Sequence, residues 1–326
     1  MRRLGRAAAG LIAVVVAAVA VLWLAAPPER AVVPPPFDAA RLGGDLDSYF
    51  AAAEREVPDL RPGAEKRVVW PGAPGRSADL ALVYLHGYSA TARDIHPVAE
   101  RVAARLNAPL ILTRLAGHGR DGAALAEPRA GDWLADLDEA LSAGRSVADR
   151  VLVMGSSTGG TLAAIAGADP RYAEGVAGVV LLSPNFAMSS PAARLLRWPG
   201  VRLWGPWVAG EERSFAPLNA EHAAWWTPRY PTSALVALGA LVAHAADLDY
   251  AATEVPALFV WSDADRVVRP EATRAVAERW GGSVTVRTLD PGPGDDPNAH
   301  VLAGDILSPG LTDAMTEIVA AWAEAL

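Results

Sequence analysis

The stretch VLVMGSSTGGTLAAIAG, residues 151–167, carries the most informative pattern in this chain. Its first four residues are all apolar, which predicts a short buried strand, and its last ten predict a helix. Between them, Gly155 and Gly159 flank Ser157 in the pattern G-x-S-x-G. Small residues on both sides of a sharp turn let strand and helix approach closely, while the serine hydroxyl stands clear of the backbone. The stretch therefore predicts a nucleophilic serine, Ser157, at a strand-to-helix turn.

Two alternatives to a nucleophilic Ser157 are open at this point. Ser156 is the neighbouring serine, but a motif centred on it needs glycine where the chain has Met154 and Thr158. The stretch also fits an unreactive glycine-serine turn. A serine hydroxyl becomes a nucleophile when a base lies in hydrogen-bond reach and an acid lies behind that base. The choice therefore depends on whether the chain supplies both partners.

The base and the acid are sought downstream, because the partners of such a serine follow it in the order acid, then histidine. Of the six histidines, only His300 follows the final predicted strands, in the polar loop PNAHVL. His300 is therefore the candidate base, and a solvated loop histidine is the alternative. The acid has two candidates, Asp263 and Asp265, because both follow the apolar strand ALFVW.

Short apolar runs alternate with longer amphipathic runs along most of the chain. This alternation is typical of a mostly parallel sheet wrapped by helices. A helix at 42–55 and a strand at 67–70 come first as edge elements. We then expect strands at 80–85, 109–113, 151–154, 178–183, 257–261 and 283–288, and helices at 91–107, 132–147, 158–167, 270–280 and 311–324. The predicted fold class is α/β, with a doubly wound sheet in a domain that spans 42–326.

One connection is too long for an ordinary crossover between strands. About 70 residues separate Leu182 from Ala257, and we expect a helical lid insertion at about 185–250. Ligand sites are lined mainly by apolar and aromatic side chains, so a tryptophan-rich insertion predicts an apolar substrate surface. Simple packing of the insertion onto the domain is the alternative. Its five tryptophans are Trp198, Trp204, Trp207, Trp225 and Trp226.

The segment after the strand 257–261 resembles the monoacylglycerol lipase and serine aminopeptidase-like group of α/β hydrolases. That group has the pattern G-x-x-D-x-V-V, and this chain has SDADRVV, with Ser262 in the glycine position. The resemblance implies an α/β-hydrolase fold and places the acid on Asp265, while Asp263 caps the turn or stays solvated. The resemblance extends over about residues 78–325, but the insertion shows almost none of it.

Two further segments share this resemblance. LVYLHGY contains His86 and ends at Tyr88. It is similar to the group's strand-H-G-x segment, whose backbone N–H lines the oxyanion hole, which implies Tyr88 together with the N–H of Thr158. LAGHG, around His118, resembles the group's G-H-G loop, which shapes the floor of the site. The resemblance thus implies structural roles for His86 and His118.

The N-terminus predicts a membrane anchor or a signal segment in residues 1–26. Three arginines precede an uncharged apolar stretch, 7–26, which is long enough to cross a hydrocarbon core of about 30 Å. Cleavage as a signal peptide is the alternative, because Ala18 and Ala20 could form a cleavage site. The basic flank stays cytoplasmic, so the catalytic domain is expected outside the cytoplasm, either membrane-anchored or secreted. The proline-rich stretch 27–41 is expected to be an extended spacer.

The composition excludes several classes of function. A formal net charge of −8 argues against nucleic-acid binding, which is built from clustered lysine and arginine. Because the chain has no cysteine, disulfides, thiolate metal sites and cysteine nucleophiles are excluded. A serine, histidine and acid mechanism requires no metal and no organic cofactor, and none is expected.

These patterns predict a serine hydrolase that cleaves carboxylic esters with apolar acyl groups. Its partner is then a small-molecule ester or lipid, as for a carboxylesterase or a monoacylglycerol or lysolipid lipase. An aminopeptidase or amidase of the same fold is the first alternative, because the three residues do not distinguish ester from amide. A non-catalytic membrane-tethered binding protein is the second, although such a protein is expected to have lost one of the three. No oligomeric state is predicted.

Overall fold

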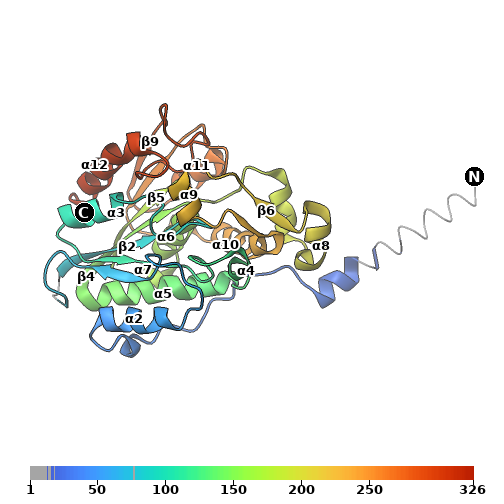
Figure 1. Cartoon of the computed structure of the whole chain (residues 1–326), viewed down its shortest axis with the longest axis horizontal. Helices are drawn as coiled ribbons and strands as arrows, with labels where there is room; N and C mark the ends of the chain where they lie inside the picture. The colour runs from blue at the N-terminus through green and yellow to red at the C-terminus, as the bar shows by residue number, and fades with distance from the viewer. Residues whose placement is uncertain (1–12, 14–15, 18, 76–77) are drawn as a thin grey trace, which may run out of the picture.

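A computed structural model describes residues 13, 16–17, 19–75 and 78–326 of the chain (Figure 1). Its centre is a seven-stranded sheet in the order β1-β3-β2-β4-β5-β8-β9. All neighbouring strands are parallel except β1, which runs antiparallel to β3. The predicted mostly parallel α/β sheet is therefore confirmed. Its strands are β1 (Arg67–Val69), β2 (Ala78–Leu85), β3 (Leu110–Leu112), β4 (Ala148–Ser156), β5 (Val176–Leu182), β8 (Ala257–Trp261) and β9 (Val284–Thr288).

Helices cover both faces of the sheet, so its central strands are buried on both sides. One face packs against α3 (Val98–Arg105) and α12 (Thr312–Ala323). Figure 1 shows α2 and α5 on the other side of the sheet from α12. The second face packs against α2 (Leu46–Arg55), α5 (Ala130–Val147), α6 (Thr158–Ala168), α10 (Leu235–Ala246) and α11 (Pro270–Arg279). Short helical segments complete the domain: η1 (Ala39–Leu42), α4 (Gly122–Leu125), α7 (Pro170–Ala173), η4 (Tyr250–Ala252) and η5 (Pro309–Leu311).

The helix predicted at 91–107 is shorter than expected. It begins at Val98, and residues 91–97 form turns instead. Pro97 stands at the helix N-cap, where its missing N–H is no loss, and its ring disfavours helical backbone at the preceding residue. The non-helical turn matters for the site, because it carries Asp94 toward the loop after β2.

The segment between β5 and β8 contains a small subdomain and one core helix. Leu238 and Leu241 of α10 are buried in the same cluster as α5 and α6, so the last part of the expected insertion belongs to the core. The tryptophans do not form one surface: Trp198 and Trp207 are exposed, whereas Trp226 is buried. The remaining elements are η2 (Pro191–Arg197), α8 (Val201–Ala209), β6 (Glu212–Ser214), α9 (Ala220–Trp225), β7 (Arg229–Pro231) and η3 (Thr232–Ala234).

The stretch predicted as a spacer, 27–41, packs along the domain instead of standing apart from it. The carboxylate of Glu29 forms an ion pair with Arg202 of α8 at 2.6 Å and another with Arg129. The N–H of Phe37 donates to Asp138 of α5 at 2.9 Å. Extended proline-rich backbone leaves its polar groups unpaired, so the N–H of Phe37 is available to the Asp138 carboxylate.

Residues 1–12, 14, 15 and 18 of the predicted anchor or signal segment, 1–26, lie outside the described residues. Among the residues that the structure describes, no helix is both long enough and apolar enough to span a membrane.

Candidate active site

Ser157 occupies a strained turn between β4 and α6. Its φ is +53° and its ψ is −111°, in a region that non-glycine residues rarely adopt. Its N–H donates to the carbonyl of Leu182 at 2.8 Å. The turn is tight on both sides, because a Cβ on Gly155 would lie 2.0 Å from the carbonyl oxygen of Gly159, and one on Gly159 would lie 1.9 Å from that of Leu85. Only glycine fits at these two positions, as the sequence pattern predicts.

The structure brings Ser157, His300 and Asp265 together from three separate loops. Ser157 Oγ lies 2.9 Å from His300 Nε2, and His300 Nδ1 lies 2.8 Å from Asp265 Oδ2. When Nδ1 carries the proton and donates it to the carboxylate, Nε2 is left as the acceptor for the serine hydroxyl. Asp265 and His300 are 8% and 9% exposed, so both are held in a site that largely excludes water.

Backbone N–H groups orient the Asp265 carboxylate. Its second oxygen, Oδ1, accepts hydrogen bonds from the N–H groups of Val267 at 2.8 Å and Val268 at 3.0 Å. Asp263 lies elsewhere and accepts from Trp261 Nε1 and from Arg274, at 2.9 and 2.8 Å. Of the two candidate acids, the structure therefore places only Asp265 against His300.

Asp296 is a positioning residue that the sequence reasoning did not identify. Its Oδ2 accepts hydrogen bonds from the N–H groups of His300 at 3.1 Å and Val301 at 2.9 Å. Its Oδ1 accepts from the N–H of Asn298 at 3.0 Å. Three bonds to one buried carboxylate fold the loop around itself and present the imidazole to Ser157. The D-P-N signal of an Asx turn could have indicated this role.

The loop after β2 lies directly against the serine. A Cβ on Gly87 would lie 3.5 Å from Ser157 Cβ, so the next peptide, which bears the N–H of Tyr88, is close to the reacting atoms. Thr158, the other predicted oxyanion residue, is the first residue of α6. Thr158 follows Ser157 directly in the chain, whereas Tyr88 comes from the loop that contacts it, and the role of their N–H groups in binding an oxyanion remains a prediction.

The Tyr88 ring joins an aromatic cluster that includes a residue of the insertion. Its ring centroid lies 5.6 Å from that of His118, 6.1 Å from Trp133 and 5.5 Å from Tyr230 of β7. All three pairs have edge-to-face geometry, which is favourable for aromatic rings. The insertion therefore contributes an aromatic side chain to the surroundings of the Tyr88 ring.

His86 and His118 are held in structural positions. His86 Nε2 accepts the N–H of Leu115 at 3.1 Å, and burial lowers the pKa of His86 to about 4. His118 Nδ1 lies 3.1 Å from the carbonyl oxygen of Ala116, and burial lowers its pKa well below the usual range. Both imidazoles are therefore neutral near pH 7. His86 ties the loop after β2 to the loop after β3, whereas His118 bonds within its own loop.

Three polar contacts join the insertion to loops near the site. The N–H of Thr227 donates to the carbonyl of Ser89 at 2.7 Å, and its hydroxyl donates to the carbonyl of Arg120 at 3.1 Å. Asn219 Nδ2 donates to the carbonyl of Ile306 at 2.8 Å. These bonds join the ends of α9 to the loops around Tyr88 and His300, and a role of the insertion as a lid remains a prediction.

Asp94 supports the loop after β2 from behind, and the sequence analysis did not identify it. Its Oδ2 accepts the N–H of Gly87 at 2.8 Å, and its Oδ1 accepts the N–H of Ile95 at 3.0 Å and the hydroxyl of Tyr84. Asp94 is 2% exposed. Burial raises the pKa of its carboxyl from 3.8 to about 7, although these hydrogen bonds partly oppose the rise.

This pKa predicts a change in stability with pH. Between about pH 4 and pH 7 the folded protein keeps a proton on Asp94 that the unfolded chain has released. The free energy of unfolding therefore falls as the pH rises through this window. The asparagine of Asp94→Asn cannot ionise. We therefore expect the Tm of this variant minus the Tm of the unsubstituted protein to increase as the pH rises from about 4 to about 7. Thermal unfolding of both proteins at matched pH values measures this, and parallel profiles would show that Asp94 contributes no such slope.

The described residues contain no group of three or more histidine, aspartate or glutamate side chains arranged to hold a metal ion.

Comparison with known proteins places the chain among hydrolases. Residues 76–292 match the sequence model of the family described as serine aminopeptidase, S33. No curated protein matches the sequence. The chain also resembles solved structures that are less than 25% identical to it, and this likeness shows the fold alone.

Three solved structures illustrate the likeness. The first comes from work on the metagenome-derived lipolytic enzymes LipS and LipT: it is 22% identical, covers 82% of this chain and 100% of its own, and has a TM-score of 0.64. A soluble variant of the Saccharomyces cerevisiae monoglyceride lipase is 10% identical, covers 81% and 92%, and has a TM-score of 0.56. The Paleococcus ferrophilus monoacylglycerol lipase is 14% identical, covers 80% and 99%, and has a TM-score of 0.55.

Proposed function

The chain belongs to the serine aminopeptidase S33 family of α/β hydrolases, and we propose that it is a serine esterase acting on carboxylic esters with apolar acyl groups. The observation that carries this proposal is the hydrogen-bonded line from Ser157 through His300 to Asp265. A serine at a glycine-flanked turn, an imidazole within hydrogen-bond reach of it and a buried carboxylate are the three parts that covalent acyl transfer needs.

In this mechanism Ser157 Oγ attacks the acyl carbonyl carbon while His300 Nε2 takes the hydroxyl proton. The carbonyl oxygen becomes an anion, which the N–H groups of Tyr88 and Thr158 stabilise by about 3 to 4 kcal/mol for each donor. Collapse breaks the bond to the alkoxide, and His300 returns the proton to the leaving alcohol. Water then attacks the acyl-enzyme with the same histidine as base, and it releases the carboxylic acid. Asp265 holds Nδ1 throughout.

The surroundings of Ser157 favour an apolar ester over a substrate with a free amine. An aminopeptidase needs a carboxylate near the scissile bond to bind the substrate's ammonium group. Between Pro184 and Ala246 the only carboxylates are Glu211, Glu212 and Glu221, and all three are exposed. Glu212 pairs with Arg229 and Glu221 accepts from Trp225, whereas aromatic rings surround Tyr88 beside the serine. Cleavage of amides by the same residues is the second candidate function.

We also propose that the enzyme lies at a lipid surface, outside the cytoplasm. α8 exposes three apolar side chains, Leu203 (68%), Trp207 (91%) and Val208 (68%). The N–H of Gly200, at the start of this helix, donates to the carbonyl of Ala26 at 2.7 Å, so the end of the apolar segment 7–26 adjoins α8 (Figure 1). An exposed apolar patch of this kind marks an interaction surface, and a tryptophan suits the boundary between lipid and water.

Relative rates on esters and amides test the proposed function. The substrates are p-nitrophenyl esters from acetate to palmitate, with leucine p-nitroanilide as the amide. We expect kcat/KM for the better esters to exceed that for the anilide by at least about 100-fold, equivalent to about 2.7 kcal/mol in transition-state free energy. Because the aromatic cluster favours apolar acyl groups, the rate should rise from acetate to longer chains. Faster cleavage of the anilide would instead establish the peptidase alternative.

A further inference from the structure

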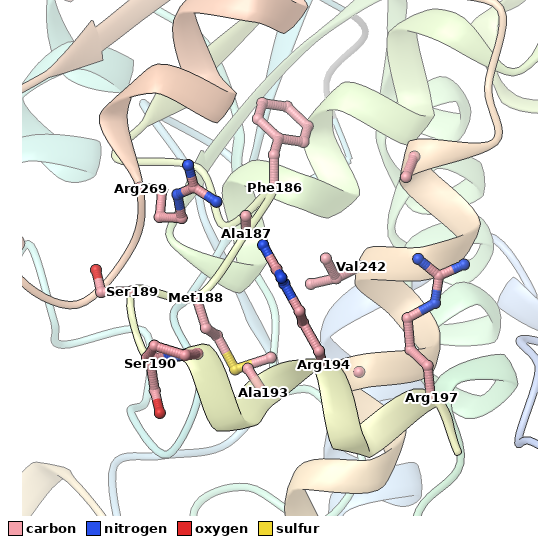
Figure 2. A pocket seen from close by; sticks show the side chains of 13 residues that line it. Phe186, Ala187, Met188, Ser189, Ser190, Ala193, Arg194, Arg197, Val242 and Arg269 are labelled. Atoms are coloured by element: carbon pink, nitrogen blue, oxygen red, sulfur yellow. The ribbon is translucent and has the colours of Figure 1, made fainter. Parts of the chain in front are cut away.

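A cavity lies between η2 and α10. Its volume is about 360 Å³, which is within the range of small-molecule sites. Figure 2 shows the loop after β5 on one side, η2 below and α10 opposite, with Arg269 entering from the loop before α11. Its apolar lining includes Phe186, Met188, Gly239, Val242 and Ala246.

The cavity is distinct from the site around Ser157. None of the lining residues belongs to the serine, histidine and acid set or to the predicted oxyanion pair. The loop after β5 separates the two, because the N–H of Asn185 donates to the Ser157 carbonyl at 3.1 Å while Phe186 and Met188 line the cavity. A ligand in this cavity would therefore occupy different space from the acyl group on Ser157.

A glycine creates the shape of the cavity floor. Gly239 of α10 faces Leu196 of η2, and a Cβ on Gly239 would lie 2.7 Å from Leu196 Cβ. The absence of a side chain lets η2 approach α10 closely at one end, while Val242 and Ala246 line the cavity further along α10. The floor is thus apolar and is formed by elements that pack directly on each other.

Three arginines surround this apolar floor. Arg194 rises into the middle of the cavity in Figure 2, while Arg269 and Arg197 stand at its edges. Among the described residues, neither Arg194 nor Arg197 forms an ion pair, and Arg269 has only Glu271 at 3.9 Å. The cavity therefore has an excess of positive charge in a chain whose net charge is −8.

We propose that this cavity is a binding site for a single-chain anionic amphiphile. The alkyl chain lies on the apolar floor between η2 and α10, and the anionic head binds Arg194 and Arg269. Guanidinium groups bind carboxylate and phosphate through paired N–H donors, so an alkyl carboxylate and an alkyl phosphate share the chemistry required. The site does not depend on hydrolysis at Ser157.

Calorimetric titration of the full chain with dodecanoate and, separately, with dodecyl phosphate tests this proposal. We expect at least one of the two to bind, and to bind at least about tenfold more tightly than dodecyltrimethylammonium, which has the same chain and the opposite charge. Arg194→Glu/Arg269→Glu should raise the Kd of the anion by at least about tenfold. Val242→Trp, which fills the floor, should weaken binding of the anion without changing charge.

The matched control is Arg55→Glu/Arg150→Glu, which makes the same charge change at exposed arginines outside the cavity and should leave the Kd unchanged. Circular dichroism and turnover of a p-nitrophenyl ester check that each variant is folded. The proposal is wrong if neither anion binds, if the ammonium binds as well as the anion, or if the cavity variants and the control behave alike. In the last case the ligand binds elsewhere on the protein.

Discussion

Ser157→Ala should lower kcat for p-nitrophenyl ester hydrolysis by at least about 10⁴-fold, the size of effect that follows loss of a nucleophile in such a site. The alanine has no oxygen to attack the carbonyl, so no acyl-enzyme can form. His300 and the backbone donors remain, and they leave a slow background reaction with water. Steady-state kinetics on the ester series measures the change.

Ser157→Ala should still fold, because the substitution removes a single side-chain hydrogen bond, the one to His300. Ser156 provides the matched control. It is the neighbouring serine, is 4% exposed and ends β4, so Ser156→Ala removes the same atom from the same turn. We expect Ser156→Ala to keep turnover within about tenfold of the unsubstituted protein. Equal losses in the two variants would mean that the turn, and not the Ser157 hydroxyl, carries the activity.

Asp265→Asn should lower kcat by about 10⁴-fold while leaving the structure of the site in place. An asparagine keeps the shape of the side chain but offers an N–H₂ group where His300 Nδ1–H needs an acceptor. The imidazole then favours the tautomer with its proton on Nε2, which cannot accept the proton of Ser157. The measurement is kcat against pH for the same esters.

Asp263→Asn is the control for this change, because it alters the other carboxylate of the same loop. Asp263 is exposed and bonds Trp261 and Arg274, so its substitution removes a surface ion pair worth about 1 kcal/mol or less. Turnover should stay within about twofold. If Asp263→Asn were the slow variant, the acid would have to be reassigned and the site would need a different loop conformation.

Two acidic residues of the site, Asp94 and Asp296, lie outside the motifs that predict the serine, the histidine and the acid, although the D-P-N sequence at Asp296 is typical of an Asx turn. Each acts by accepting hydrogen bonds from backbone N–H groups: Asp94 from Gly87, and Asp296 from His300 and Val301. From the sequence alone, a carboxylate in a loop is expected to be solvated. Its hydrogen bonds to backbone N–H groups are known only once the loop is folded. The aromatic contact between Tyr88 and Tyr230 is equally invisible in the sequence, because it joins β7 of the insertion to the loop after β2.

What could be derived from the order of residues was local. Strands and helices have short periods, so neighbouring residues are enough to indicate them. This is why the glycines around Ser157 and the alternation of apolar and amphipathic runs could be interpreted, and why His300 could be placed after the last strand. Only the folded chain showed that α10 belongs to the core and that Glu29 binds Arg202. It also brought Arg194 and Arg269 to one apolar cavity. These contacts join segments far apart in the chain, and their formation depends on how the helices pack on the sheet, which no local pattern specifies.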